Sequence, residues 1–135
     1  IIKNDHLIFI DDYAHHPVEI TALLRSAKDL FAGKKVTAIF QPHLFTRTRD
    51  FADEFCKSLS LADEVILLDI YPAREMPIKG INSEMLLQGI SAETKSLVSK
   101  EELFSKILES KPEVLLTVGA GDIDKLVEPL KKALS

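Results

Sequence analysis

The chain has 135 residues, of which 46% are hydrophobic and 28% are charged, and its formal net charge is −4. These proportions are typical of one folded domain with a buried core, and they exclude a disordered tail. No apolar run approaches the ~18 residues of a membrane-spanning helix, and the acidic balance disfavours a protein that binds nucleic acid by its phosphates, so we expect neither a membrane nor a nucleic acid as partner.

Short apolar runs alternate with amphipathic segments along the chain. Pro17 suits the first turn of a helix that Gly33 ends. Polar loops are predicted at residues 41–48 and 69–80. We predict strands at residues 7–10, 36–40, 65–68, 96–98 and 114–118, and helices at residues 17–31, 51–59, 83–88, 103–108 and 123–134.

Apolar strands that alternate with helices predict a parallel sheet with a helical layer on each face. We therefore expect an α/β fold, a three-layer Rossmann-like domain with a mostly parallel open sheet. In such sheets ligands bind at the carboxyl ends of the strands. The sequence begins with Ile1 rather than Met, and we expect it to be an excised piece of a longer protein.

Polar side chains gather in the turns that follow the predicted strands. Because the carboxyl ends of parallel strands meet at one edge of a sheet, these turns are candidates for one shared site. The clusters are Asp11, Asp12, Tyr13, His15 and His16; Gln41, His43, Thr46, Arg47, Thr48 and Arg49; Asp69, Tyr71, Arg74 and Glu75; and Gly119, Gly121 and Asp122.

Several of these residues also have purely structural interpretations. Asp11 or Asp12 is a candidate N-cap of the following helix. His16 is more consistent with a cap or a turn than with a catalyst. Arg49 and Asp50 are expected to pair locally or to lie on a solvated helix start.

Arg47 differs from its neighbours because it is predicted at the start of a helix. A cation there opposes the helix macrodipole unless an anion is also present. A carboxylate or phosphate ligand explains a guanidinium at such a position. We therefore predict that Arg47 binds an anion.

The segment Gly119-Ala120-Gly121 matches half of the dinucleotide-binding fingerprint, but Asp124 stands where the third glycine belongs. The favoured interpretation is a tight turn with Asp122 as the cap of the last helix. The sequence contains neither the phosphate-binding loop of nucleoside triphosphatases nor the Gly-x-Ser-x-Gly motif of α/β-hydrolases.

Disulfide and metal chemistry are not expected in this chain. Its single cysteine, Cys56, excludes an internal disulfide and is predicted to lie in the core. His15 and His16 are adjacent, so their side chains are expected to point in different directions. We therefore predict no metal site.

Four motifs resemble, in family order, the C-terminal domain of the Mur ligases, the ATP-dependent amide-forming enzymes of peptidoglycan synthesis. The likeness covers nearly the whole chain. The first motif is shared widely in the family, whereas the second points to the alanine-adding member. The motifs are Asp11-Asp12-Tyr13-Ala14-His15-His16-Pro17, Phe40-Gln41-Pro42-His43 with Thr46-Arg47-Thr48-Arg49, Ile70-Tyr71-Pro72-Ala73-Arg74-Glu75, and Gly119-Ala120-Gly121-Asp122-Ile123.

The resemblance implies a three-domain parent in the bacterial cytoplasm. An N-terminal domain would hold the UDP-sugar, and a central domain would carry the phosphate loop and the magnesium ligands. Residues 1–135 would be the amino-acid-binding domain, with residues 1–6 near the junction. ATP would phosphorylate the carboxylate of UDP-N-acetylmuramate, and L-alanine would attack the acyl phosphate. The parent would need ATP and Mg²⁺, whereas this domain alone would bind neither tightly and would be inactive.

The resemblance also assigns residues. Tyr13, His15, His43 and Arg47 match the L-alanine site, with Arg47 paired to the alanine carboxylate. His15 and His43 match the catalytic positions that hold the nucleophile and nearby phosphate-bearing groups. Asp12 matches a hinge aspartate near the ATP ribose.

Two alternatives remain open at this stage. The first is a related ligase that recycles whole murein peptides, although Tyr13 and the segment Arg47-Thr48-Arg49 argue against it. The second is a stand-alone module that binds a nucleotide or a small anion. It rests on the turn at Gly119 and on the positive helix ends.

Overall fold

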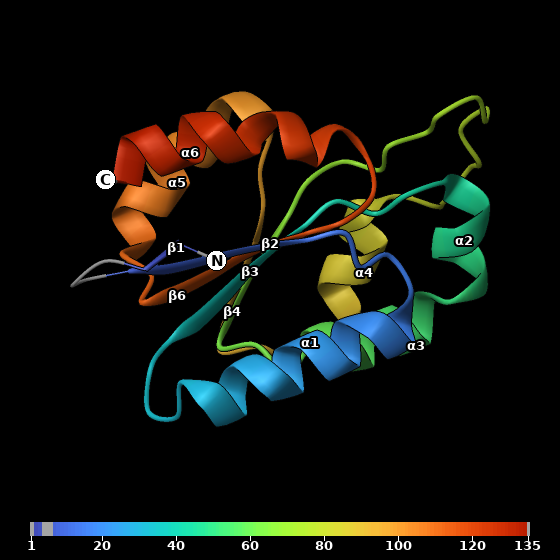
Figure 1. Cartoon of the computed structure of the whole chain (residues 1–135). Helices are drawn as coiled ribbons and strands as arrows, with labels where there is room; N and C mark the ends of the chain where they lie inside the picture. Colours follow the sequence, from blue (N-terminus) through green and yellow to red (C-terminus); the bar gives the residue numbers. More distant parts are fainter. Residues whose placement is uncertain (1, 4–6, 135) are drawn as a thin grey trace.

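The computed structural model of the chain describes residues 2–3 and 7–134. Six strands form one sheet in the order β1-β2-β6-β3-β4-β5, and β2 to β6 all run parallel (Figure 1). The strands are β1 (Ile2–Lys3), β2 (Ile8–Asp12), β3 (Val36–Phe40), β4 (Glu64–Leu67), β5 (Thr94–Leu97) and β6 (Val114–Val118). The predicted parallel sheet is therefore confirmed.

The short strand β1 is the antiparallel member of the sheet and was not predicted. Ile2 pairs with Phe9 of β2. Two residues are too few to show the alternation or the apolar run by which a strand is recognised. Residues 1 and 4–6 of the expected junction lie outside the described residues.

Helices cover both faces of the sheet, as predicted. Helices α1, α3 and α4 lie on one face, and α5 and α6 lie on the other (Figure 1). The helices are α1 (Pro17–Leu30), α2 (Phe45–Asp50), α3 (Ala52–Leu59), α4 (Ser83–Gly89), α5 (Lys100–Ser110), the 3₁₀ helix η1 (Asp122–Leu126) and α6 (Val127–Leu134).

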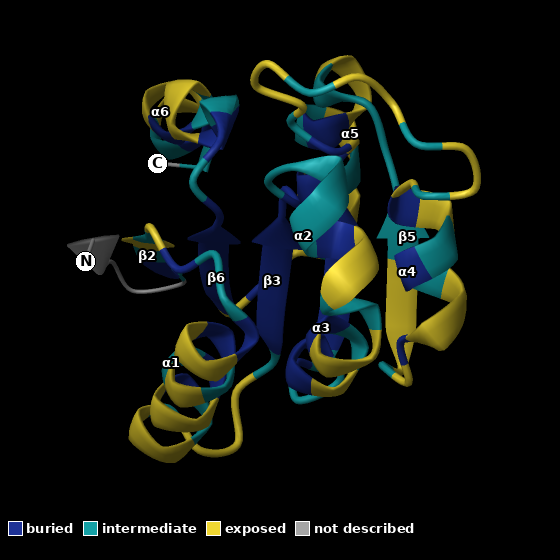
Figure 2. Ribbon diagram, turned by 90° about the vertical axis from the view of Figure 1, so that its right-hand side faces the viewer, coloured by how far each residue is buried: buried dark blue, intermediate teal, exposed yellow. Residues whose placement is uncertain are grey.

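Two apolar clusters, one on each side of the sheet, fill the space between these layers. Successive residues of a strand point to opposite faces, so Ala38 packs toward α1 and α3 while Ile39 packs toward α5 and α6. Every residue of β3 and β6 is buried, and Figure 2 shows these central strands enclosed by the helices. The three-layer α/β prediction is confirmed.

The region 41–59 departs from the predicted elements. The expected loop at 41–48 contains most of α2, and the expected helix at 51–59 is a separate helix, α3, that begins at Ala52. Phe51 separates them because its φ of −121° and ψ of 23° are not helical. Helix α2 buries only Thr48, so it has no apolar stripe that would reveal it.

The helix starts depend on specific side chains. His16 accepts a hydrogen bond from the Val18 N–H, and Glu19 accepts one in return from the His16 N–H, so the predicted cap role of His16 is confirmed. The alternative that Asp11 or Asp12 caps α1 is wrong. Cys56 is half-buried and packs against the core at the edge of α3. In residues 2–3 and 7–134, no helix is long and apolar enough to cross a membrane.

Substitution of Ser99 by Ala should lower the free energy of unfolding by about 1 kcal/mol, because Ser99 is the N-cap of α5. Its hydroxyl accepts from the Glu102 N–H at 3.2 Å, and the Ser99 N–H donates to the Glu102 carboxylate at 3.1 Å. Urea unfolding of the chain measures the change. Ser105→Ala in the exposed middle of the same helix is the matched control, and equal midpoints for the two variants would contradict the cap assignment.

Candidate functional site

The carboxyl ends of three adjacent strands bring the predicted turns together. Asp12 of β2 lies level with Val118 of β6, and Val118 lies level with Phe40 of β3. The chain leaves all three strands at this level and in the same direction. The turns that begin at Tyr13, Gln41 and Gly119 therefore start side by side.

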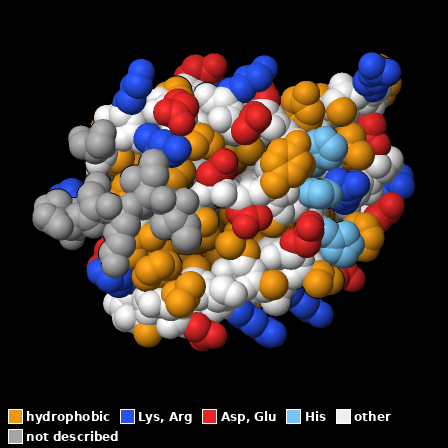
Figure 3. Space-filling view, viewed as in Figure 1, with side chains coloured by type: hydrophobic (Ala, Val, Ile, Leu, Met, Phe, Trp, Pro, Cys, Tyr) orange, Lys and Arg blue, Asp and Glu red, His pale blue; other side chains and the backbone are white. Residues whose placement is uncertain are grey.

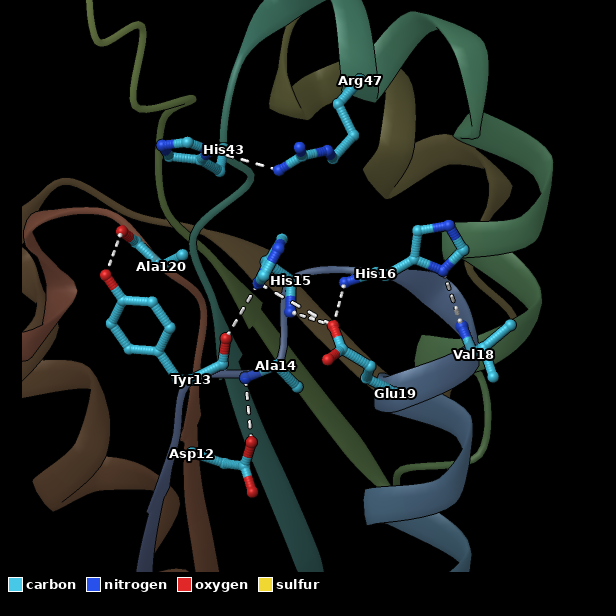
Figure 4. Close-up of polar contacts among 10 residues, drawn as sticks. All are labelled: Asp12, Tyr13, Ala14, His15, His16, Val18, Glu19, His43, Arg47 and Ala120. Atoms are coloured by element: carbon cyan, nitrogen blue, oxygen red, sulfur yellow. Dashed lines mark hydrogen bonds and ion pairs between the residues drawn. The ribbon is translucent and has the colours of Figure 1, made fainter.

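Tyr13 and His15 project from the turn after β2 (Figure 4). Tyr13 is 66% exposed, and its hydroxyl donates to the Ala120 carbonyl at 3.4 Å. The His15 ring lies 6.3 Å from the Tyr13 ring, edge to face, and its Nδ1 lies 3.1 Å from the Tyr13 carbonyl. The turn thus presents a phenol and an imidazole at the edge of the sheet where the strands have their carboxyl ends. We call this edge the rim.

His43 and Arg47 approach the same rim from the segment after β3. Arg47 Nη1 lies 3.3 Å from His43 Nδ1, and the ring centres of His15 and His43 are 6.5 Å apart. Figure 3 shows imidazoles beside basic side chains at this end of the molecule, and Figure 4 shows Arg47 and His43 facing the turn that carries His15. The structure therefore places the four residues named for the L-alanine site, Tyr13, His15, His43 and Arg47, at one rim.

The two imidazoles offer opposite hydrogen-bonding groups. A guanidinium can only donate, so His43 Nδ1 accepts from Arg47 and the ring proton lies on Nε2. A carbonyl can only accept, so His15 Nδ1 donates to Tyr13, and Nε2 of neutral His15 carries a lone pair. The rim thus combines a donor on His43 with an acceptor on His15.

The surroundings of His43 favour its neutral form. Burial lowers the pKa of His43 below its ordinary value, and the positive charge of Arg47 and the neighbouring His15 lower it further. The carboxylate of Glu75 acts in the opposite direction but does not outweigh them. His43 therefore stays neutral near pH 7 and keeps its Nε2 donor.

Arg47 is the third residue of α2 (Phe45–Asp50), so it does lie near a helix start, although the helix is the short α2 and not the one predicted at residues 51–59. Because α2 has only six residues, Arg47 also lies in its last turn, so the macrodipole does not by itself require an anion beside it. The guanidinium instead faces His43. Arg49 does pair locally, since its Nε donates to Asp50 at 2.9 Å.

The side chain of Gln41 connects the segment that carries His43 to the turn at Gly119-Ala120-Gly121. It is only 3% exposed, and its side-chain amide donates to Asp122 at 2.7 Å and accepts from the Ile123 N–H at 2.9 Å. Gly119 has a φ of +140°, and a Cβ there would lie 2.8 Å from the Gln41 carbonyl oxygen. Gly119 therefore allows two backbone segments to touch, which is the tight turn that the sequence predicts.

The predicted cap role of Asp122 is wrong. The residue before η1 is Gly121, which makes no side-chain cap. Asp122 instead pairs with Lys100 and with Gln41. Burial alone would raise the pKa of Asp122, but these hydrogen bonds lower it overall. Nothing in the sequence shows this contact, because Lys100 and Gln41 are far from Asp122 along the chain.

The two acidic residues at the end of β2 each accept a hydrogen bond from within the chain. Asp12 accepts from the Ala14 N–H at 2.8 Å, and Asp11 accepts from the Thr117 hydroxyl at 2.7 Å. Within residues 7–134, no three His, Cys, Asp or Glu side chains lie close enough together to hold a metal ion.

A cavity of about 330 Å³ is lined by Tyr71 but not by His43. It mixes one ammonium group with three carboxylates, so it does not favour an anion. Its lining residues are Gln41, Asp69, Ile70, Tyr71, Pro72, Ser99, Lys100, Glu101 and Asp122.

Comparison with known proteins gives one family. The sequence model of the family described as "Mur ligase, glutamate ligase domain" matches residues 1–121. A UDP-N-acetylmuramate–L-alanine ligase of Parabacteroides distasonis is 56% identical over 133 residues, which is 98% of this chain and 29% of that protein. The chain spans about three tenths of the length of the curated relatives it matches.

Solved structures share the fold at low sequence identity. A murein peptide ligase from Psychrobacter arcticus matches 99% of this chain and 28% of its own, with a TM-score of 0.74 and 20% identity. A domain crystallised from Haemophilus ducreyi matches over the whole of both chains, with a TM-score of 0.69 and 20% identity. This fold therefore forms without further domains, and the present chain has its own two apolar clusters to sustain it.

Removal of the Arg47 charge should raise the pKa of His43. In Arg47→Met the value should move toward that of free histidine but stay below it, because the burial remains. The lowered pKa of His43 also makes the stability of the folded chain depend on pH. Because the pKa of His43 is lower in the folded chain than in the unfolded chain, neutral His43 contributes to the stability of the fold. This contribution is lost as the pH falls from about 6.5 through the pKa of the folded state. Arg47→Met should make this loss of stability smaller.

The measurement is an NMR titration of the His43 ring protons in the isolated chain. Arg49→Met is the matched control, because Arg49 pairs with Asp50 rather than with His43. A His43 pKa that is the same in Arg47→Met and in the unsubstituted chain would remove the contact between the two side chains.

Substitution of Gln41 by Leu should cost about 1–3 kcal/mol of stability, because it leaves the buried Ile123 N–H without a partner. Urea unfolding at pH 7 measures the loss. Gln88→Leu, on the exposed part of α4, is the control. If both variants unfold at the same urea concentration, the amide of Gln41 does not hold the turn.

Proposed function

This chain belongs to the Mur ligase family, and from that premise we propose that it is the amino-acid-binding C-terminal domain of an ATP-dependent ligase that joins L-alanine to UDP-N-acetylmuramate. The observation that carries the proposal is the meeting of Arg47, His43, His15 and Tyr13 at one rim. The 56% identity to a ligase of that name supports the choice of substrate.

The rim suits a small zwitterion. Arg47 uses one donor on His43, so its remaining guanidinium N–H groups are available to a carboxylate. The Nε2 donor of His43 supplies a further hydrogen bond to the same carboxylate. The Nε2 acceptor of His15 suits the ammonium end. One amino acid placed between the imidazoles would therefore meet a donor at its acid end and an acceptor at its amine end.

The proposed reaction has two steps. In the first, the carboxylate of UDP-N-acetylmuramate takes the γ-phosphoryl group of ATP, which gives an acyl phosphate and ADP. In the second, His15 Nε2 accepts a proton from the alanine ammonium, and the free amine attacks the acyl carbon. The C–N bond forms as the C–O bond to phosphate breaks, inorganic phosphate leaves with one of the two amine protons, and the other proton stays on the amide nitrogen. His43 and Arg47 hold the alanine carboxylate during the attack.

The remaining chemistry belongs to other parts of the parent protein. The sequence has no phosphate-binding loop, and the described residues offer no cluster for Mg²⁺. We propose that Asp12 lies near the ATP ribose at the boundary with a central domain that holds ATP and Mg²⁺. The N-terminal domain would bind UDP-N-acetylmuramate. Since ATP is a cytoplasmic compound, we place the parent in the bacterial cytoplasm.

The murein peptide ligase of similar fold defines the second candidate, a domain that takes a whole peptide instead of alanine. The two candidates differ in the size of the incoming amine. Competition between L-alanine and a murein tripeptide in the full-length ligase separates them. A stand-alone nucleotide-binding module is the third, and calorimetry of this chain with ATP and with NAD tests it.

In the full-length ligase, Arg47→Ala should raise the KM for L-alanine by about 10- to 100-fold, because a charged hydrogen bond contributes about 1.5–3 kcal/mol. The KM values for ATP and UDP-N-acetylmuramate should stay close to those of the unsubstituted enzyme. Steady-state assays of phosphate release measure all three. Arg49→Ala is the matched control.

Two results would count against the proposal. An unchanged requirement for alanine in Arg47→Ala would remove Arg47 from the amino-acid site. Turnover of the three substrates by the isolated 135-residue chain would reject the division of the reaction among three domains.

A further inference from the structure

We propose that the loop after β4 positions the His43–Arg47 pair, with Tyr71 and Glu75 as its positioning residues. The effect on alanine rests on the proposed function, but the placement of His43 is measurable without it. The sequence motif Tyr71-Pro72-Ala73-Arg74-Glu75 otherwise has no role at the site. Of these five residues, Tyr71 and Glu75 are half-buried and the three between them are exposed.

Tyr71 holds the backbone on both sides of His43. The Tyr71 N–H donates to the Pro42 carbonyl at 2.8 Å, and the Leu44 N–H donates to the Tyr71 carbonyl at 2.8 Å. These bonds form an isolated parallel bridge between His43 and Tyr71, outside the named strands. These hydrogen bonds therefore hold the backbone at His43, just before α2, as a parallel strand pairing would.

Tyr71 also orients the imidazole. The rings of His43 and Tyr71 are stacked, with centres 5.7 Å apart and planes at 15°. The Tyr71 ring thus lies in an offset stack beside His43, and Arg47 donates to the ring edge at Nδ1. A ring held in this way presents its Nε2 donor in one direction.

Glu75 holds the start of the helix that carries Arg47. The residue before α2 is Leu44, which has a φ of 71° and cannot cap the helix with its apolar side chain. The Glu75 carboxylate takes that role from another loop, since it accepts from the Thr46 N–H at 3.1 Å and from the Thr46 hydroxyl at 2.5 Å. The hydrogen bond from the Thr46 hydroxyl is the main cause that lowers the pKa of Glu75.

The loop therefore contacts the segment 42–47 at two points. One contact is beside His43, and the other is at Thr46, three residues later. The contacts are at Pro42 and Leu44, on either side of His43, and at Thr46, the residue before Arg47. If the loop acts on position, its loss should change the hydrogen bonding of His43 more than it changes the stability of the chain.

The test is the tautomer of His43 in the isolated, ¹⁵N-labelled chain, read from the long-range ¹H–¹⁵N spectrum of its ring. The unsubstituted chain should show mainly the Nε2–H form. Glu75→Ala and Tyr71→Leu should shift His43 toward a mixture of tautomers while the chain remains folded. Glu75→Gln keeps one acceptor oxygen and should give an intermediate result, which also covers the case in which Glu75→Ala does not fold. Glu109→Gln, an exposed carboxylate in α5, is the matched control.

The outcomes are distinct. A folded Glu75→Gln or Tyr71→Leu chain that keeps the His43 signature of the control would overturn the proposal. In the full-length ligase, Glu75→Ala should also raise the KM for alanine by about tenfold with the KM for ATP unchanged. If the tautomer changes but the KM for alanine does not, the positioning role stands and the assignment of the rim to alanine fails.

Discussion

The register between β2, β6 and β3 is the constraint on which the site depends. Asp12, Val118 and Phe40 end their strands at the same level, and each is followed at once by a turn of the rim. A slip of one residue in β6 would exchange its two buried faces, so the apolar side chains of Leu115 and Leu116 would each meet the wrong helical layer. The packing of the core thus fixes the relative position of the polar turns, although the side chains of Tyr13, His15, His43 and Arg47 do not belong to the core.

Much of this arrangement is predictable because strong apolar patterns carry it. The five parallel strands and the helices α1, α4 and α5 follow from runs of apolar residues and from spacing. The elements that the sequence does not reveal are those with little apolar content, namely the two residues of β1 and the six of α2. The contacts of Gln41 with Asp122 and of Thr46 with Glu75 were also not predictable, since the partners are 81 and 29 positions apart and neither pair has a sequence pattern.

The position of Arg47 depends on contacts that its place in the sequence does not show. Arg47 is the third residue of the six-residue helix α2 rather than a residue at the start of the helix predicted at 51–59, so it lies in both the first and the last turn and the macrodipole does not explain its role. Two contacts place Arg47 at the rim. Glu75 caps the start of α2, and His43 accepts a hydrogen bond from the Arg47 guanidinium. The polarity of the site therefore comes from neighbouring loops acting on one another.

The openness of the rim sets a requirement on the rest of the parent protein. Tyr13 is 66% exposed, and the groups that face the proposed alanine lie at the surface of the domain. An acyl phosphate reacts with water as well as with an amine, and hydrogen bonds to a carboxylate are weakened in water. On the proposed function, the site reaches its working form only when another domain covers this rim. On the same proposal, the domain would close over the site as a rigid body, because the strands that carry the rim are packed on both faces.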